Sequence, residues 1–226
     1  MHHIPIIINS CKPFVDKAAN LLIDSLSKSG VPHEYIIVVV GECDEDRVFI
    51  KNGIKYQETK TINIDLNGLL WLFSQYPTCV SQSGWFFYLH DTCIVTQDFW
   101  ENVQRIYDQQ LKDSNYMAGP IHKIGCNMGF YKYKVFESER VNHFLTNSPN
   151  FDLQKKQAEK IKGIHYEDHI FRISNSLILS DEMIVEETDT LYYSSKVPRK
   201  LYTYPIPGII KIKANWEAKH EYCVDL

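Results

Sequence analysis

The chain has 226 residues, of which 44% are hydrophobic and 23% are charged, and its formal net charge is -4. This length suits one large domain or two small ones that share a sheet, and the composition is ordinary for a soluble globular protein. The negative charge argues against a broad nucleic-acid-binding surface, and no apolar run approaches the roughly 18 residues that a membrane span needs.

The cysteines and the amino terminus predict the compartment. The six cysteines lack CxxC spacing, which argues against a structural zinc site and against a small disulfide scaffold. Residues 1–8 show neither a basic region nor a long apolar stretch, so they are not typical of a signal peptide. We therefore expect a cytoplasmic protein with reduced cysteines.

The first forty residues predict a strand, a helix and a second strand. Residues 4–8 form a β-branched run that ends at Asn9-Ser10, and residues 34–40 form another. Between them, apolar residues recur at helical spacing after Pro13 until Gly30. A unit of this order and length favours two parallel strands joined by a right-handed crossover.

The next segment predicts a hairpin and a second helix. A polar loop begins at Gly41-Glu42, and short strands at residues 48–50 and 56–58 flank an Asn52-Gly53 turn. Another short strand is expected at residues 61–64. Asp65 or Asn67 can then cap a helix that runs to Tyr76.

The most informative stretch is residues 85–95. Its apolar and aromatic run from Trp85 to Leu89 predicts a strand that is buried on both faces. His90-Asp91-Thr92 follow directly, at the carboxyl end of the strand, where open α/β sheets bind their ligands.

The second half alternates in the same way. Thr96 caps an expected helix that runs to about residue 111, and Glu167-Asp168 open a later one. Strands are expected at residues 116–120 and 126–131, a helix at 135–145, a Lys-rich surface helix with loop at 147–162, and short strands after residue 181.

Several of these motifs stand in the order found in one family. The chain resembles a glycosyltransferase of the GT-A fold, the nucleotide-diphospho-sugar transferase type. The likeness rests on the first strand–helix–strand unit, on the 85–95 strand in the place of the family's DxD metal motif, and on three later motifs. These are Gly119-Pro120 with the strand at 126–131, His165–Arg172 with its late acidic pair, and Lys213–Trp216.

The resemblance implies an α/β fold: a single Rossmann-like GT-A domain over residues 1–226, with a central, mostly parallel mixed sheet flanked by helices. Residues 1–95 would form the nucleotide-sugar-binding half and residues 96–226 the acceptor-binding half. Contacts to the donor would come from strand-end loops and from nearby basic or polar residues, namely Ser10, Gly41, Glu42, Asp65, His90, Asp91 and Lys213.

The implied cofactor is a divalent cation, Mn²⁺ or Mg²⁺, that bridges the two phosphates of the donor. Candidate ligands are His90, Asp91, Thr92 and His220. The family commonly has Asp-x-Asp where this chain has His90-Asp91-Thr92, so Asp91 is the one conventional ligand for a hard cation in the motif.

The implied reaction transfers a hexosyl or pentosyl group from a nucleotide-sugar, UDP-sugar by default, to a hydroxyl of a carbohydrate or other acceptor. Asp168 or Glu167 would deprotonate that hydroxyl, and the carboxylate pair favours inversion. The developing charge on the leaving diphosphate would be met by the cation or by basic residues, for which His90, His220, Lys213 and Arg172 are candidates.

Two other functions stay open, and each motif also has a structural interpretation. A sugar-phosphate nucleotidyltransferase is disfavoured because residues 9–13 lack the glycines of a phosphate loop. A catalytically inactive GT-A domain that binds a glycan or a partner would explain the incomplete DxD. Asp91-Thr92 can form an ordinary turn, Glu167-Asp168 can favour a helix dipole, and His220 can be a solvated surface residue.

Overall fold

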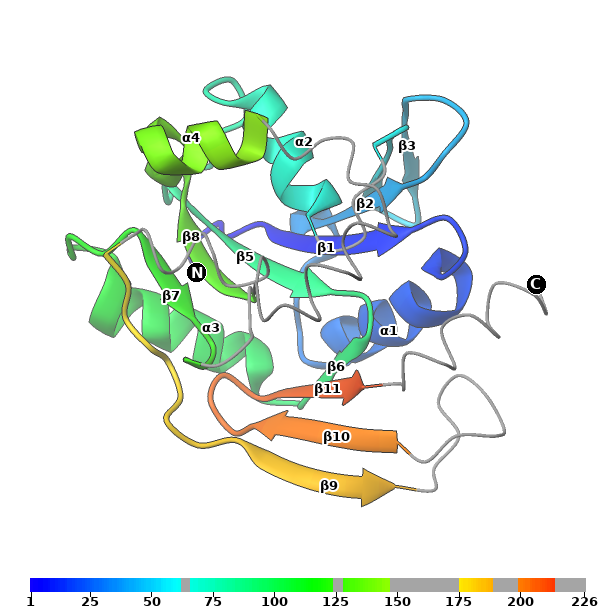
Figure 1. The fold of residues 1–226 in the computed structure, drawn as a ribbon. Helices are drawn as coiled ribbons and strands as arrows, with labels where there is room; N and C mark the ends of the chain where they lie inside the picture. The colour runs from blue at the N-terminus through cyan, green and yellow to red at the C-terminus, as the bar shows by residue number, and fades with distance from the viewer. Residues whose placement is uncertain (62–65, 124–127, 147–174, 189–198, 214–226) are drawn as a thin grey trace, which may run out of the picture.

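The fold is described from a computed structural model, and the description covers residues 1–61, 66–123, 128–146, 175–188 and 199–213 (Figure 1). Two sheets organise these residues. A seven-stranded sheet lies between two layers of helices, and a four-stranded sheet lies beside it.

The large sheet has the order β3-β4-β2-β1-β5-β8-β7. Its strands are β1 (Ile6–Cys11), β2 (Ile36–Gly41), β3 (Arg47–Lys51), β4 (Ile54–Glu58), β5 (Trp85–His90), β7 (Ala118–Pro120) and β8 (Gly129–Lys132). The neighbours β4, β2, β1 and β5 are parallel, whereas β3 and β8 run antiparallel to their neighbours. Because β8 is antiparallel to both β5 and β7, β7 runs with β5. The expected α/β class with a mostly parallel mixed sheet is therefore confirmed.

The small sheet is antiparallel throughout, with the order β6-β11-β10-β9. Its strands are β6 (Cys93–Val95), β9 (Ile184–Thr188), β10 (Arg199–Tyr204) and β11 (Ile209–Lys213). Only Asp91 and Thr92 separate β5 from β6. The chain therefore passes from the large sheet to the small one at the polar end of the expected buried strand (Figure 1).

Helices cover both faces of the large sheet (Figure 1). One layer holds η1 (Val15–Ala19), α1 (Asn20–Lys28), α3 (Phe99–Ile106) and η3 (Tyr107–Leu111), and η2 (His33–Tyr35) precedes β2. The opposite layer holds α2 (Asn67–Gln75), η4 (Tyr133–Glu137) and α4 (Glu139–Thr146). In the described part of the chain, no helix is both long enough and apolar enough to cross a membrane.

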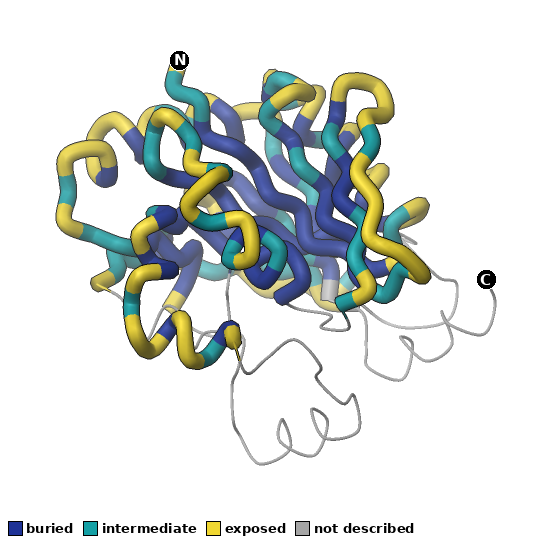
Figure 2. The backbone as a smooth tube through the Cα atoms, turned by 90° about the horizontal axis from the view of Figure 1, so that it is seen from above, coloured by how far each residue is buried: buried dark blue, intermediate teal, exposed yellow. Residues whose placement is uncertain are grey.

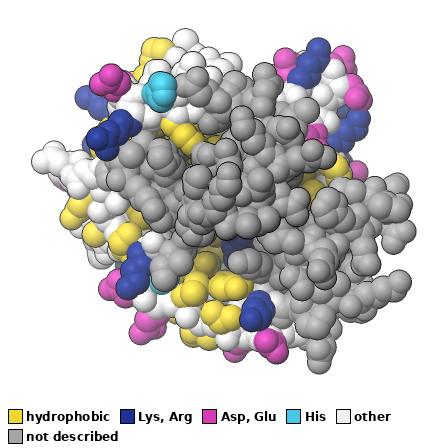
Figure 3. Space-filling model, viewed as in Figure 1, with side chains coloured by type: hydrophobic (Ala, Val, Ile, Leu, Met, Phe, Trp, Pro, Cys, Tyr) yellow, Lys and Arg dark blue, Asp and Glu magenta, His cyan; other side chains and the backbone are white. Residues whose placement is uncertain are grey.

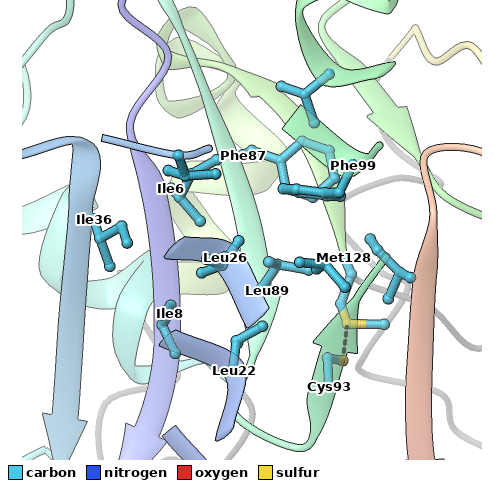
Figure 4. Close-up of a cluster of buried hydrophobic side chains, with 14 of the residues drawn as sticks. Ile6, Ile8, Leu22, Leu26, Ile36, Phe87, Leu89, Cys93, Phe99 and Met128 are labelled. Carbon is cyan, nitrogen blue, oxygen red and sulfur yellow. Dashed lines mark hydrogen bonds between the residues drawn. The ribbon is translucent and has the colours of Figure 1, made fainter. Parts of the chain in front are cut away.

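The period of two along each strand divides the core into two clusters. Ile6 and Ile8 pack with α1, whereas Ile7 packs with α2 on the other face. Phe87 and Phe86 divide in the same way, and Figure 4 shows Phe87 against Phe99 in the α1 and α3 layer. The central strands are buried along their length (Figure 2), which explains why their sequences are continuous apolar runs rather than alternating ones.

Local expectations were met unevenly. The hairpin around Asn52-Gly53 and the helices after Pro13 and Thr96 are present. The capping expectations were wrong, because Asn67 is the first residue inside α2 and Asp98, not Thr96, is at the N-cap position of α3. Thr61 lies outside any strand, and residues 62–65 lie outside the described part.

The glycine at the start of β8 lets β7 and β8 approach closely. Gly129 has φ +135°, and a Cβ added there would lie 2.2 Å from the carbonyl oxygen of Gly119. Beyond β7, residues 175–180 continue the pairing, since the amides of Leu177 and Leu179 donate to Ala118 and Pro120. The edge of β7 is thereby covered.

We predict that Gly129→Ala lowers the free energy of unfolding by at least about 3 kcal/mol, because it adds a backbone clash to an unfavourable φ. The matched control is Gly30→Ala, where φ is +89° and a Cβ would meet nothing within 4 Å, so the expected loss is about 1 kcal/mol. Urea unfolding measures both. Equal losses would show that the close approach of β7 and β8 contributes nothing.

Candidate functional site

The order of the strands creates a switch point between β1 and β5. From β1 the chain moves outward to β2 and β4 on one side, and it then returns to β5 on the other side. Both neighbours of β1 are parallel to it. In open α/β sheets, ligands bind in the crevice outside the carboxyl ends of the strands at such a point.

The carboxyl ends of β1 and β5 are joined there by a buried hydrogen bond. Ser10 Oγ donates to Asp91 Oδ2 over 2.7 Å, and the backbone amide of Asp91 donates to the carbonyl of Asn9 over 3.0 Å. Ser10 is 2% exposed and Asp91 is 8% exposed. Two residues predicted separately as donor contacts therefore lie in direct contact.

The two neighbours of Asp91 occupy different environments. His90 is the last residue of β5, is buried, and lies opposite Asn9 in the register of β1 and β5. Its ring is 5.8 Å from that of Tyr88. The carbonyl of Thr92 accepts from the amide of Ile212 in β11 over 2.9 Å. Asp91 is thus held between a pairing to β1 before it and a pairing to the small sheet after it.

The end of β2 has a special backbone conformation. Glu42 follows Gly41 with φ 62°, in the left-handed region that few residues other than glycine adopt. Its amide donates to the carbonyl of Thr61, and the carbonyl of Gly41 accepts from Lys12. The predicted donor residues Gly41 and Glu42 therefore lie at the same edge of the sheet as Ser10, one strand away.

An ion pair that was not predicted from the sequence also lies at this edge. Lys12 Nζ lies 2.6 Å from Asp44 Oδ2, so the loops that follow β1 and β2 are linked. The hydrogen bond from Lys12 lowers the pKa of Asp44, and the same bond raises the pKa of Lys12. Lys12 directly follows β1, and Asp44 lies in the polar loop after β2. Because these two strands were expected to be parallel, their loops were expected at one edge of the sheet, and that signal could have paired them.

Five of the predicted site residues lie outside the described part of the chain: Asp65, Glu167, Asp168, Arg172 and His220. Lys213 is the last residue of β11, and its backbone pairs with Lys200. The division into a donor half at 1–95 and an acceptor half at 96–226 stays a prediction.

A cation at this site would depend on Asp91. Among the residues that the structure describes, no three His, Cys, Asp or Glu side chains gather as a metal-binding group. Mg²⁺, however, is commonly held through one or two carboxylates together with substrate phosphates and waters. The carboxylate of Asp91, oriented by Ser10, would supply the protein's part of such a site.

On the face seen in Figure 3, basic and acidic side chains of the described residues lie in small mixed groups around the periphery. No single sign of charge covers the described part of this face.

Comparison with known proteins gives similarities of fold. No family model and no curated protein matches this sequence. The crystal structure of residues 1–349 of TarS from S. aureus is similar to 79% of this chain, with 13% identity and a TM-score of 0.45. The structure of the same protein in complex with UDP has 11% sequence identity to this chain and a TM-score of 0.41. This chain spans 59% of the length of each of those chains.

We predict that Ser10→Ala lowers the free energy of unfolding by about 2 kcal/mol, because the buried Asp91 carboxyl loses a hydrogen-bond donor. The control is Ser74→Ala on the exposed side of α2, for which a change within about 0.5 kcal/mol is expected. Denaturant titration compares the two. If Ser10→Ala lowers the free energy of unfolding no more than Ser74→Ala does, the buried hydrogen bond between Ser10 and Asp91 does not stabilise the protein as we predict.

Proposed function

We propose that the protein is a glycosyltransferase that moves a sugar from a nucleotide-diphosphate donor to a hydroxyl acceptor. The observation that supports this most is the Ser10–Asp91 hydrogen bond at the switch point between β1 and β5. It supports the proposal because the Asp91 carboxylate is held at the carboxyl end of β5, and open α/β sheets commonly bind nucleotides at such strand ends.

The donor would lie along the carboxyl ends of β2, β1 and β5. In this arrangement Glu42 and the backbone of Gly41 face the nucleoside part, and Ser10 and Asp91 face the diphosphate. The Lys12–Asp44 pair links the two loops between which the nucleotide would lie. Asp65 and Lys213 are further donor contacts in the proposal.

The proposed cofactor is Mn²⁺ or Mg²⁺, held by Asp91, with His90, Thr92 and His220 as further candidate ligands. When bound, such a cation neutralises the charge that develops on the leaving diphosphate. The protein must then orient the Asp91 carboxyl. The hydrogen bond from Ser10 does this because it fixes Oδ2, one of the two carboxyl oxygens.

Transfer also requires a base for the acceptor hydroxyl. Asp168 or Glu167 is proposed for this step, with inversion at the anomeric carbon and UDP as the first nucleotide to test. Two alternatives remain: a sugar-phosphate nucleotidyltransferase and an inactive glycan- or partner-binding module. The first is disfavoured by the loop after β1, which lacks a glycine-rich phosphate cradle.

We predict that calorimetric titration detects a nucleoside diphosphate binding in the presence of Mn²⁺, and that Asp91→Ala weakens this binding about a hundredfold, equivalent to about 2.7 kcal/mol. Asp113→Ala is the matched control, because Asp113 is an exposed carboxylate beyond α3 and η3, and it should bind as wild type does. Removal of the cation with EDTA should weaken wild type and leave Asp91→Ala unchanged. Absence of any nucleotide binding would favour the binding module.

The base assignment has its own test. Asp168→Asn or Glu167→Gln should reduce the transfer rate by about a hundredfold or more while donor affinity is kept, since general-base catalysis typically contributes about 10² to 10⁴. Single-turnover transfer and calorimetry on the same variants separate the two quantities. Full activity in both variants would exclude the pair as the base.

A further inference from the structure

Four residues, two on the strands and two on the helix, bring the carboxyl ends of β1 and β2 against the first turn of α2 around two side-chain amides. Asn9 on β1, Gly41 on β2, and Asn67 and Gly68 on α2 form this set, which we call the amide cluster. Asn9 is 2% exposed and Asn67 is fully buried. Burying a side-chain amide lowers stability unless the amide is hydrogen-bonded. Two buried amides beside the proposed donor site are therefore expected to have a structural or functional role.

The first contact is a directed hydrogen bond. The amide of Gly68 donates to Oδ1 of Asn9 over 2.9 Å. No side chain at the N-cap position of α2 caps the helix, so Asn9 supplies from the sheet an acceptor for one of the first amides of the helix. The carbonyl of the same residue accepts from the amide of Asp91. Asn9 therefore connects α2 to the strand end that holds Asp91.

The second contact depends on the glycine at position 41, which has no side chain. A Cβ on Gly41 would lie 1.8 Å from Nδ2 of Asn67 and 2.4 Å from its Cγ. Because Asn67 is fully buried, its amide cannot swing into solvent to make room. While Asn67 is in place, the end of β2, next to Glu42, can lie beneath α2 without displacing the first turn of the helix only if residue 41 is glycine.

The third contact brings the helix onto β5. A Cβ on Gly68 would lie 2.8 Å from Cε2 of Tyr88, and the ring of Tyr88 packs edge-on against that of His90. The first turn of α2 thus touches each of the three strands whose carboxyl ends form the candidate site.

We propose that Asn9 and Asn67 are positioning residues of the donor site, which through the first turn of α2 set the relative positions of Glu42, Ser10 and Asp91 without touching the donor. This inference rests on the proposed function for its ligand. It adds that donor affinity depends on the Gly41–Asn67 contact, which lies behind the site on the α2 face of the sheet.

A double-mutant cycle on Gly41 and Asn67 tests the proposal. Gly41→Ala should weaken the binding of UDP with Mn²⁺ about tenfold, because the displaced amide moves α2 and the end of β2. In an Asn67→Ala background, which leaves room for the new methyl group, Gly41→Ala should change affinity less than about twofold. Equal losses in both backgrounds would mean that the added methyl group disturbs donor binding without displacing Asn67, and would overturn the positioning role.

A ligand-free measurement keeps this proposal separate from the proposed function. Native-state hydrogen exchange of the Gly68 and Asp91 amides should accelerate in Gly41→Ala and in Asn9→Ala, and should return towards wild type in the Gly41→Ala, Asn67→Ala double variant. Ser74→Ala, at the other end of α2, should leave both amides unchanged. If wild type binds no nucleotide, the proposed function fails. If exchange at both amides is unaffected by Gly41→Ala, the positioning role fails whatever binds.

Discussion

The candidate site depends on the hydrogen bond between Ser10 and Asp91. It joins residues 81 positions apart in the sequence and is possible only because β5 lies beside β1 instead of extending the sheet beyond β4. A carboxyl group that is 8% exposed requires such a partner, since burial without one is unfavourable. The bond is therefore a consequence of the strand order, and it lies where the candidate site is.

Asp91 lies at the junction of the two sheets, and the backbone on both sides of it is hydrogen-bonded. Its own amide is bonded to β1, and the carbonyl of the next residue, Thr92, is bonded to β11 in the small sheet. Sites that depend on precise placement of a charged group are best built on regular elements whose positions are fixed by packing. The aromatic strand before Asp91 provides that packing, because both of its faces are covered by helices.

Helix α2 links this junction to the rest of the donor edge. Its first turn is held by the amide cluster, through one hydrogen bond and two close approaches at glycine, in addition to the apolar contacts of its leucines. An apolar contact alone would hold the helix against the sheet without fixing its position along its own axis. The directed hydrogen bond from Gly68 to Asn9 fixes that position as well. A proposed metal-assisted transfer, in which one carboxylate orients a cation and its phosphates, would depend on such fixed geometry.

The sequence by itself determined the alternation of strands and helices, the buried strand at 85–90 and the polar ends of the strands, because hydrophobic periodicity and turn residues are local signals. It also identified Ser10 and Asp91 as separate candidates. It could not determine that the two touch, that Asn67 lies inside α2 instead of capping it, or that Lys12 reaches Asp44. Those contacts follow from the order and register of the strands, which are set by the packing of residues far apart in the chain.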